Sequence, residues 1–189
     1  MLARLQSSLP LAFLLMPLAW CTLWNDPAMA GPRSSGPDFR VDDRDLSKPL
    51  QIIAYGDMRF TDPRETAATN PKVRRWLVDR IAMEKPDAVL LSGDIPWQGG
   101  DANDYAVYRS ETKNWADLHL RIYPALGNHE FKGIEKQCLD NWWNTFPELR
   151  PLRYYSVQLG NSVYVVNLDS NFATYVRQRA DGLARQAVS

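Results

Sequence analysis

Three short motifs decide the fold of this chain: Gly56-Asp57-Met58-Arg59, Gly93-Asp94-Ile95 and Gly127-Asn128-His129-Glu130. Each motif closely follows a short apolar run, and these runs cover residues 50–55, 88–91 and 120–125. Short apolar runs that are bounded by glycine or other turn residues are typical of buried strands. The pattern therefore predicts three strands with a polar motif at the carboxyl end of each.

The spacing of the motifs predicts how the strands are arranged. Asp57 and Asp94 lie 37 positions apart, and Asp94 and Asn128 lie 34 positions apart. Each interval contains a helical pattern that is long enough for a crossover, so the three strands are expected to be parallel. They would then deliver two carboxylates, an amide and an imidazole to one edge of an α/β sheet, where ligands bind in open sheets.

Two helices are expected between the strands. Asn70-Pro71 combines an N-cap residue with proline at the first helical position, and Lys85-Pro86 ends that helix. Val73, Trp76, Leu77, Arg80 and Ile81 follow helical spacing, with Arg80 as the polar exception, and predict the inner face of the helix. A second helix is expected over residues 101–118, with one side formed by Tyr105, Tyr108, Thr112 and Trp115.

The C-terminal third of the chain is expected to contain a helix and a hairpin. The helical pattern covers residues 135–146 and is closed by Pro147. Two β-rich runs, at 154–159 and 163–168, are joined by Gly160-Asn161-Ser162, which is a hairpin signal. Residues 174–188 have the pattern of an amphipathic helix.

The composition is that of an ordinary globular protein. The chain has 189 residues, of which 45% are hydrophobic and 23% are charged, and this fits one domain. Lys plus Arg and Asp plus Glu each number 22, so the formal net charge is zero. No nucleic-acid partner is expected, because such proteins carry a clustered basic excess. Phosphate groups can still bind, because a metal site carries its own positive charge.

The first 30 residues have the pattern of a signal peptide. Arg4 supplies a basic start, residues 9–20 form a short apolar segment, and Ala28-Met29-Ala30 offers the small residues that a signal peptidase reads. An uncleaved membrane anchor is the alternative, although the apolar stretch is shorter than the about 20 residues that a span requires. We expect cleavage near Ala30 and an exported protein that is periplasmic or extracellular, without a stable membrane span.

The expected domain order is a signal peptide over residues 1–30, a linker over 31–48 and one folded domain over 49–189. The linker segment is rich in Pro, Gly, Ser and charged residues. Cleavage would remove Cys21 and leave Cys138 as the only thiol. The domain is therefore expected to have no internal disulfide and to be stabilised by its hydrophobic core.

Each motif also has a purely structural explanation. Aspartate after a strand commonly caps the next helix or closes a turn, and that explanation suffices for Asp57 or Asp94 taken alone. Gly127-Asn128-His129-Glu130 is more specific, because two further hydrogen-bonding side chains flank the histidine. Together the motifs form an oxygen-rich cluster with one histidine, which suits a divalent metal and a phosphate-like substrate.

In the order and spacing of these motifs the chain resembles the calcineurin-like metallophosphoesterase superfamily, which is related to the purple acid phosphatases. The family pattern is Asp-x-His, then Gly-Asp, then Gly-Asn-His-Glu or Gly-Asn-His-Asp, each after a strand, and two later histidine motifs complete a two-metal site. The resemblance covers residues 50–169. It implies an α/β fold of the metallophosphoesterase sandwich type with flanking helices. It also implies a small-molecule phosphoester substrate and two divalent or trivalent metal ions, Fe, Mn or Zn.

The resemblance also implies a role for each motif residue. Asp57 would bind one metal and Asp94 would bridge both. Asn128 would bind the second metal through its amide oxygen and would also contact the substrate. His129 would contact the phosphate or protonate the leaving oxygen, and Glu130 would orient His129, so these two are the expected catalytic residues. A metal-bound hydroxide would attack the phosphorus in line with the leaving oxygen.

Two features depart from the family pattern. Arg59 stands where the family has a histidine ligand, and arginine has no lone pair to offer a metal. Arg59 is either a surface residue or a bidentate contact to a substrate phosphate. The chain has two histidines, His119 and His129, so the later metal-binding histidines are absent. His119 precedes the third strand and is expected to be structural.

These departures leave two functions open. The first is a two-metal phosphoester hydrolase that is impaired because its C-terminal metal ligands are lost, in a sandwich truncated after its first half. The alternative is a non-catalytic fragment or pseudoenzyme that retains a weak metal or phosphate site. A periplasmic phosphate-binding protein has support from Arg59 alone. The sequence has no Gly-x-Ser-x-Gly elbow, no Gly-rich phosphate loop and no dinucleotide fingerprint, which excludes those chemistries.

Overall fold

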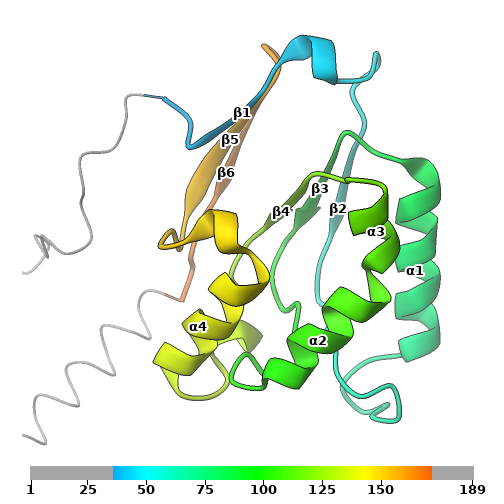
Figure 1. Ribbon diagram of the computed structural model, residues 1–189, viewed down its shortest axis with the longest axis vertical. Coiled ribbons are helices and arrows are strands. Elements are labelled where there is room, and N and C mark those ends of the chain that lie inside the picture. The colour runs from blue at the N-terminus through cyan, green and yellow to red at the C-terminus, as the bar shows by residue number, and fades with distance from the viewer. Residues whose placement is uncertain (1–35, 172–189) are drawn as a thin grey trace, which may run out of the picture. The chain divides into compact units, whose positions relative to one another are not determined.

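A computed structural model describes residues 36–171 and shows a mixed α/β domain (Figure 1). The predictions for residues 1–35 and 172–189, which include the signal peptide, Cys21 and the C-terminal helix, lie outside the described residues. The described part contains two three-stranded sheets with the strand orders β2-β3-β4 and β1-β5-β6. The predicted fold class is confirmed.

The first sheet contains the three predicted parallel strands. They are β2 (Ile52–Tyr55), β3 (Ala88–Leu91) and β4 (Ile122–Pro124). The strands β2 and β3 pair in parallel with Ile52 opposite Ala88, and β3 pairs in parallel with β4 with Val89 opposite Ile122. Val89 and Leu91 are buried, which explains why β3 has a continuous apolar run. All three strands therefore end at the same edge of the sheet.

Three helices lie on one side of this sheet (Figure 1). The first is α1 (Pro71–Glu84), which starts as predicted: the Asn70 side chain accepts hydrogen bonds from two backbone N–H groups of its first turn. The other two are α2 (Ala102–Glu111) and α3 (Lys113–Asp117), where one helix was expected. The break lies at Thr112, whose φ of −95° and ψ of 15° depart from helical values and whose hydroxyl and backbone N–H both donate to the Tyr108 carbonyl.

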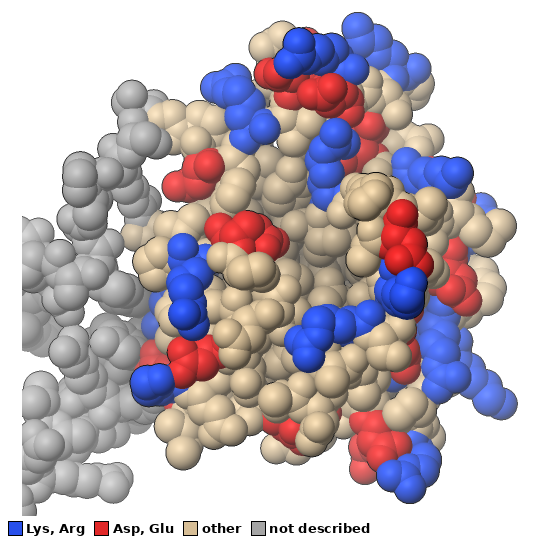
Figure 2. All heavy atoms as spheres, viewed as in Figure 1, with Lys and Arg blue, Asp and Glu red and all other residues tan. Residues whose placement is uncertain are grey.

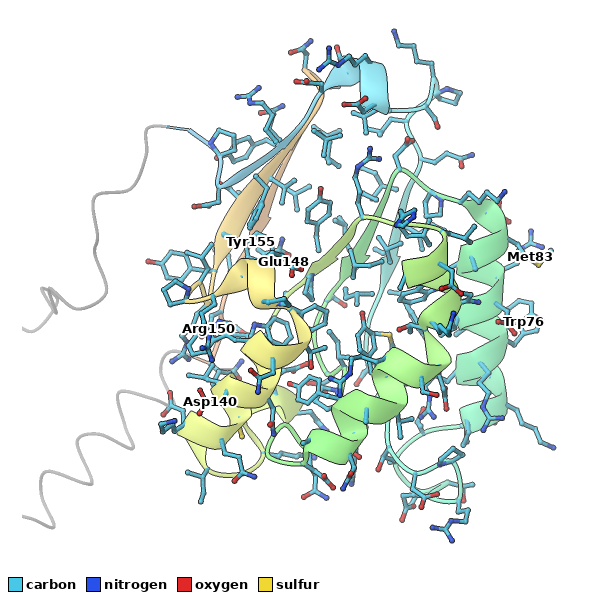
Figure 3. The ribbon with its side chains drawn as sticks, in the orientation of Figure 1. Trp76, Met83, Asp140, Glu148, Arg150 and Tyr155 are labelled. Atoms are coloured by element: carbon cyan, nitrogen blue, oxygen red, sulfur yellow. The ribbon has the colours of Figure 1, made fainter. Side chains whose placement is uncertain are left out.

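The buried face of α1 differs from the prediction. Val73 and Trp76 were expected inside but are 50% and 63% exposed, and Figure 3 shows Trp76 pointing away from the sheet. The buried positions instead include Arg74, Val78 and Ile81. Arg74 is drawn inward because it forms a bidentate ion pair with Glu111 at the end of α2. By contrast, the predicted inner side of α2 and α3 is buried as expected.

The second sheet contains the predicted hairpin of β5 (Tyr155–Leu159) and β6 (Val163–Asn167), which is antiparallel. It follows α4 (Glu135–Thr145) and the 3-10 turn η4 (Pro147–Leu149). The Tyr155 hydroxyl donates to the carbonyl of Pro124 over 2.7 Å and so ties β5 to β4. Both sheets contribute to one buried apolar core, which includes Val89, Leu91, Val157 and Leu159.

Part of the expected linker is structured. Within residues 31–48, the strand β1 (Phe39–Val41) pairs in parallel with β5, and the 3-10 turn η2 (Asp43–Asp45) follows it. The Asp38 carboxylate accepts the N–H of Ser156 over 2.7 Å and fixes the register. A strand of three residues is too short for a periodic pattern, and it forms because the edge of β5 offers unpaired backbone groups.

Within residues 36–171, none of the helices combines the length and the apolar character needed to cross a membrane. Figure 2 shows Lys and Arg interspersed with Asp and Glu over the face in view, with no large patch of one sign. Cys138 is a buried free thiol.

Candidate active site

The loops that follow β2, β3 and β4 meet in an open hollow of about 590 Å³. Asp57, Arg59, Asp94 and Asn128 all line it, so the structure brings together four of the predicted site residues. The hollow is also lined by three residues that were not expected in the site, Ser92, Ser170 and Asn171. Asn171 is positioned by its side-chain amide, which donates to the Gly127 carbonyl over 3.1 Å.

The first two loops hold three non-glycine residues in the left-handed region. Their φ angles are 58° for Asp57, 48° for Arg59 and 55° for Asp94. Such conformations cost about 1–3 kcal/mol each and gather at functional sites. They are held here because the Asp57 N–H donates to the Gly93 carbonyl and the Arg59 N–H donates to the Asp94 carbonyl. The backbone therefore presents these side chains at the sheet edge in a fixed arrangement.

The loops after β3 and β4 approach too closely for side chains at two motif positions. A Cβ atom on Gly127 would lie 2.5 Å from the Asp94 nitrogen, and one on Gly93 would lie 2.6 Å from the Gly127 nitrogen. Gly93 also has a φ of 93°. Glycine at both positions is therefore required to bring Asp94 next to the third motif.

Glu130 ties the same two loops together. Its buried carboxylate accepts the backbone N–H groups of Asp94, Ile95 and Gly127 over 3.0, 2.8 and 2.7 Å. Burial raises the pKa of Glu130 to about 7, against the lowering effect of these hydrogen bonds. The expectation that Glu130 orients His129 is wrong in this structure, because its acceptor oxygens are used by the backbone of the two loops.

His129 is oriented instead by Trp97 and Lys132. Its Nδ1 lies 2.7 Å from the Trp97 carbonyl and its Nε2 lies 2.8 Å from the Lys132 ammonium. A carbonyl accepts and an ammonium donates, so Nδ1 carries the proton and Nε2 accepts from Lys132. The His129 N–H donates to Asp94 Oδ1 over 3.0 Å, and Nε2 lies 3.8 Å from Asp94 Oδ2. His129 therefore lies behind Asp94, not among the residues that line the hollow.

The protonation of His129 is set by this environment. Burial lowers its pKa most, while the Trp97 carbonyl and the Asp94 carboxylate raise it. The cations Lys132 and Arg59 lower it further. The Lys132 ammonium also lies 4.1 Å from the centroid of the Trp97 ring. The net effect is a lowered pKa, so burial and the two cations favour the neutral imidazole.

Lys132 and Trp97 were not predicted as site residues. Lys132 follows His129 by three positions, which is the spacing at which side chains meet on a helical turn, so the sequence carried a signal for it. Nothing in the sequence indicated Trp97, because it reaches His129 from a different loop. His119, expected to be structural, is exposed and lies in the turn after α3.

Asp57, Asp94 and Asn128 offer oxygen donors to a cation in the hollow, but Arg59 lies beside two of these donors. Within residues 36–171, no group of three or more His, Cys, Asp or Glu side chains is placed to hold a metal ion. Arg59 Nη2 lies 2.6 Å from Asp57 Oδ1 and 3.6 Å from Asp94 Oδ2, so a guanidinium occupies the space between the two predicted carboxylate ligands. Asn128 is the third predicted ligand and lines the same hollow.

Parallel strands that deliver carboxylates, an amide and a guanidinium to one hollow define a domain of the ligand-binding α/β class. A sequence model of the calcineurin-like phosphoesterase family matches residues 50–181, which is more than half of the chain. The chain therefore belongs to the calcineurin-like phosphoesterase family, a family of metal-dependent phosphoester hydrolases that generally bind two divalent metals. A search of curated proteins found no significant match.

Proposed function

We propose that this chain hydrolyses a phosphoester bond of a small-molecule substrate whose phosphoryl group binds in the hollow. The observation that carries the proposal is the placement of Arg59 and Asn128 in one hollow at the carboxyl edge of β2, β3 and β4. A guanidinium offers paired N–H donors that match phosphoryl oxygens, and the Asn128 amide adds a further donor. The family assignment supports the reaction class.

The remaining site residues have positions that suit supporting roles. His129 is proposed to act through Asp94, because its backbone N–H donates to Asp94 Oδ1 over 3.0 Å, whereas its Nε2 accepts from Lys132 and has no proton for the leaving oxygen. Glu130 acts indirectly in this proposal, because it holds the loops that carry Asp94 and Asn128.

A metal requirement is part of the proposal. Asp57, Asp94 and Asn128 are the candidate ligands, and Mn, Zn or Fe are the candidate ions, because carboxylate and amide oxygens suit such cations. When bound, the metals would supply positive charge and an activated water. The finding that Arg59 bridges both aspartates favours a second candidate, a non-catalytic protein that binds phosphate or metal weakly.

Turnover separates the two candidates. The full chain is purified and assayed with p-nitrophenyl phosphate and bis-p-nitrophenyl phosphate, with Mn²⁺, Zn²⁺ or Fe and with a chelator. We expect turnover that requires metal and is lost in Asp94→Asn. The control is His119→Ala, which changes an exposed histidine in the turn after α3 and should retain turnover. Phosphate binding without turnover under every metal condition would instead favour the non-catalytic candidate.

We also propose that the chain is exported and that its mature form begins at Gly31. The support is the basic start at Arg4, the apolar segment over residues 9–20 and the small residues of Ala28-Met29-Ala30. N-terminal sequencing of the protein secreted by a bacterial host tests this. Recovery of an intact Met1 on membrane-bound protein would contradict it.

A further inference from the structure

The Arg59 guanidinium lies where the two aspartate motifs meet. Its Nη2 atom is 2.6 Å from Asp57 Oδ1 and 3.6 Å from Asp94 Oδ2. All three side chains line the hollow. A cation held by both carboxylates would have to share the space that the guanidinium fills.

We propose that Arg59 is the resident cation of this site: it neutralises Asp57 and Asp94, a divalent cation binds there by displacing it, and the displaced guanidinium turns to the phosphoryl oxygens of the substrate. The last part rests on the proposed function, whereas the competition with a divalent cation does not. Arg59 thus has two states, one without and one with a bound divalent cation.

Electrostatics makes such a displacement feasible. Asp57 is 70% exposed at its side chain, so its pair with Arg59 is screened by water and is weak. The Asp94 side chain is 13% exposed, so its interaction with a cation is stronger than in bulk water. A divalent ion doubles the charge that faces both carboxylates and can therefore replace a singly charged guanidinium.

The hydrogen bonds of Arg59 indicate that the observed side-chain position is not its only favourable one. Its Nε–H is buried and has no hydrogen-bond partner. An unpaired buried donor is costly, and turning the side chain toward an oxyanion would satisfy it. The backbone of Arg59 is held separately, because its N–H donates to the Asp94 carbonyl and its carbonyl accepts from Arg74. The side chain can therefore turn while the loop stays in place.

Two binding titrations test the proposal, and neither needs turnover. The substitution Arg59→Gln is expected to raise the affinity in one and to lower it in the other. Calorimetry first measures Mn²⁺ binding to the unmodified chain and to Arg59→Gln, which removes the charge but keeps a polar side chain. We expect the variant to bind Mn²⁺ on the order of tenfold more tightly, because the competing cation is gone. Inorganic phosphate is then titrated in saturating Mn²⁺, and we expect Arg59→Gln to bind it about tenfold more weakly.

Arg64→Gln is the matched control. Arg64 forms an ion pair with Asp62 on the same loop, but it is 91% exposed and does not line the hollow. This variant should leave both affinities unchanged. Arg59→Lys keeps the positive charge and should keep the Mn²⁺ affinity within about threefold of the unmodified chain. Thermal unfolding checks that each variant is folded.

The two affinities either support or overturn the proposal. Tighter Mn²⁺ binding and weaker phosphate binding in Arg59→Gln alone support the two states of Arg59. Mn²⁺ binding that is unchanged or weaker in this variant, or an equal change in Arg64→Gln, overturns the proposal. An absence of phosphoester turnover would count against the proposed function and would leave these binding results standing.

Discussion

Among single residues, Glu130 contributes most directly to the arrangement of the site. It is 1% exposed, and its carboxylate accepts hydrogen bonds from three backbone N–H groups that belong to two different loops. Unpaired buried N–H groups are costly, so this one side chain keeps the Asp94 and Gly127 segments in contact. The Glu130 carboxylate therefore connects the two loops that carry Asp94 and Asn128.

The pKa of Glu130 predicts how stability depends on pH. Burial raises its pKa from 4.5 to about 7 in the folded chain. The stability from this group is therefore fully present below pH 4.5 and is lost as the pH rises through 7. We expect the unmodified chain to lose up to about 3 kcal/mol relative to Glu130→Gln between pH 4.5 and 8. Urea unfolding at both pH values measures this, and a constant difference between the two proteins would contradict it.

Lys132 is expected to influence the titration of His129. Replacing Lys132 by Met removes a nearby positive charge that lowers the pKa of His129, so that pKa should rise. NMR titration of the imidazole protons measures it. The chain has two histidines, and the signal of the exposed His119 provides an internal reference. An unchanged titration of His129 in the variant would show that the Lys132 contact is absent in solution.

At the scale of elements, a buried ion pair connects α1 and α2. Arg74 donates to both oxygens of Glu111 over 2.9 and 2.7 Å, and its side chain is 1% exposed. The Arg74 guanidinium also packs 4.7 Å from the centroid of the Phe60 ring. This pair determines which face of α1 is turned inward, and it leaves Trp76 and Met83 exposed (Figure 3).

Breaking this pair on one side should be strongly destabilising. Arg74→Met leaves the Glu111 carboxylate without its main partner, and we expect a loss of about 3 kcal/mol in the free energy of unfolding. The double variant Arg74→Met/Glu111→Leu should recover much of this loss, because no buried charge is left alone. The control is Arg80→Met, which breaks an exposed pair with Glu84 on the same helix and should cost less than about 0.5 kcal/mol. Chemical unfolding that gives equal losses for Arg74→Met and Arg80→Met would refute this account.

The caps and breaks of the helices were predictable where they depend on neighbouring residues. Asn70 and Pro71 start α1 as expected, because an N-cap satisfies N–H groups only two and three positions away. The inner face of α1 was predicted wrongly, because the helical spacing of apolar residues favoured Val73 and Trp76. The observed face depends on the ion pair between Arg74 and Glu111, which are 37 positions apart and so are not linked by any local pattern.

For the whole molecule, the second sheet leaves apolar surface in contact with solvent. Within residues 36–171, β6 pairs with β5 on one side only. Tyr164, Val166 and Leu168 are 53%, 58% and 67% exposed. An apolar row along a strand edge favours association between chains.

A charge on this row should reduce self-association. We expect Val166→Lys to lower light scattering in concentrated solution while the unfolding temperature changes little, since charged edge residues oppose strand pairing. Val165→Lys is the matched control: Val165 packs against the core from the opposite face of β6, so this variant should lose stability. Equal scattering by the unmodified chain and Val166→Lys would show that this row does not drive association.

The elements and motifs that local patterns encode were predictable from the amino-acid sequence. Three apolar runs, the Gly-Asp and Gly-Asn-His-Glu motifs and the hairpin signal predicted the parallel strands, the hairpin and the shared sheet edge. This was possible because strand periodicity, caps and turn chemistry act over a few neighbouring residues, and because parallel strands align their carboxyl ends. Asp57, Asp94 and Asn128 were placed together by this reasoning, whereas Arg59 was left open and His129, expected at the same edge, does not line the hollow.

The contacts of those side chains, by contrast, depend on how the folded backbone brings the loops together. The contact of Arg59 with Asp94, the hydrogen bonds of the Glu130 carboxylate to two loops and the contact of His129 with Trp97 each join different loops. The pairing of β1 with β5 joins residues that are 118 positions apart. Such contacts depend on which groups the packed backbone brings within hydrogen-bonding distance, and no pattern of neighbouring residues encodes that distance.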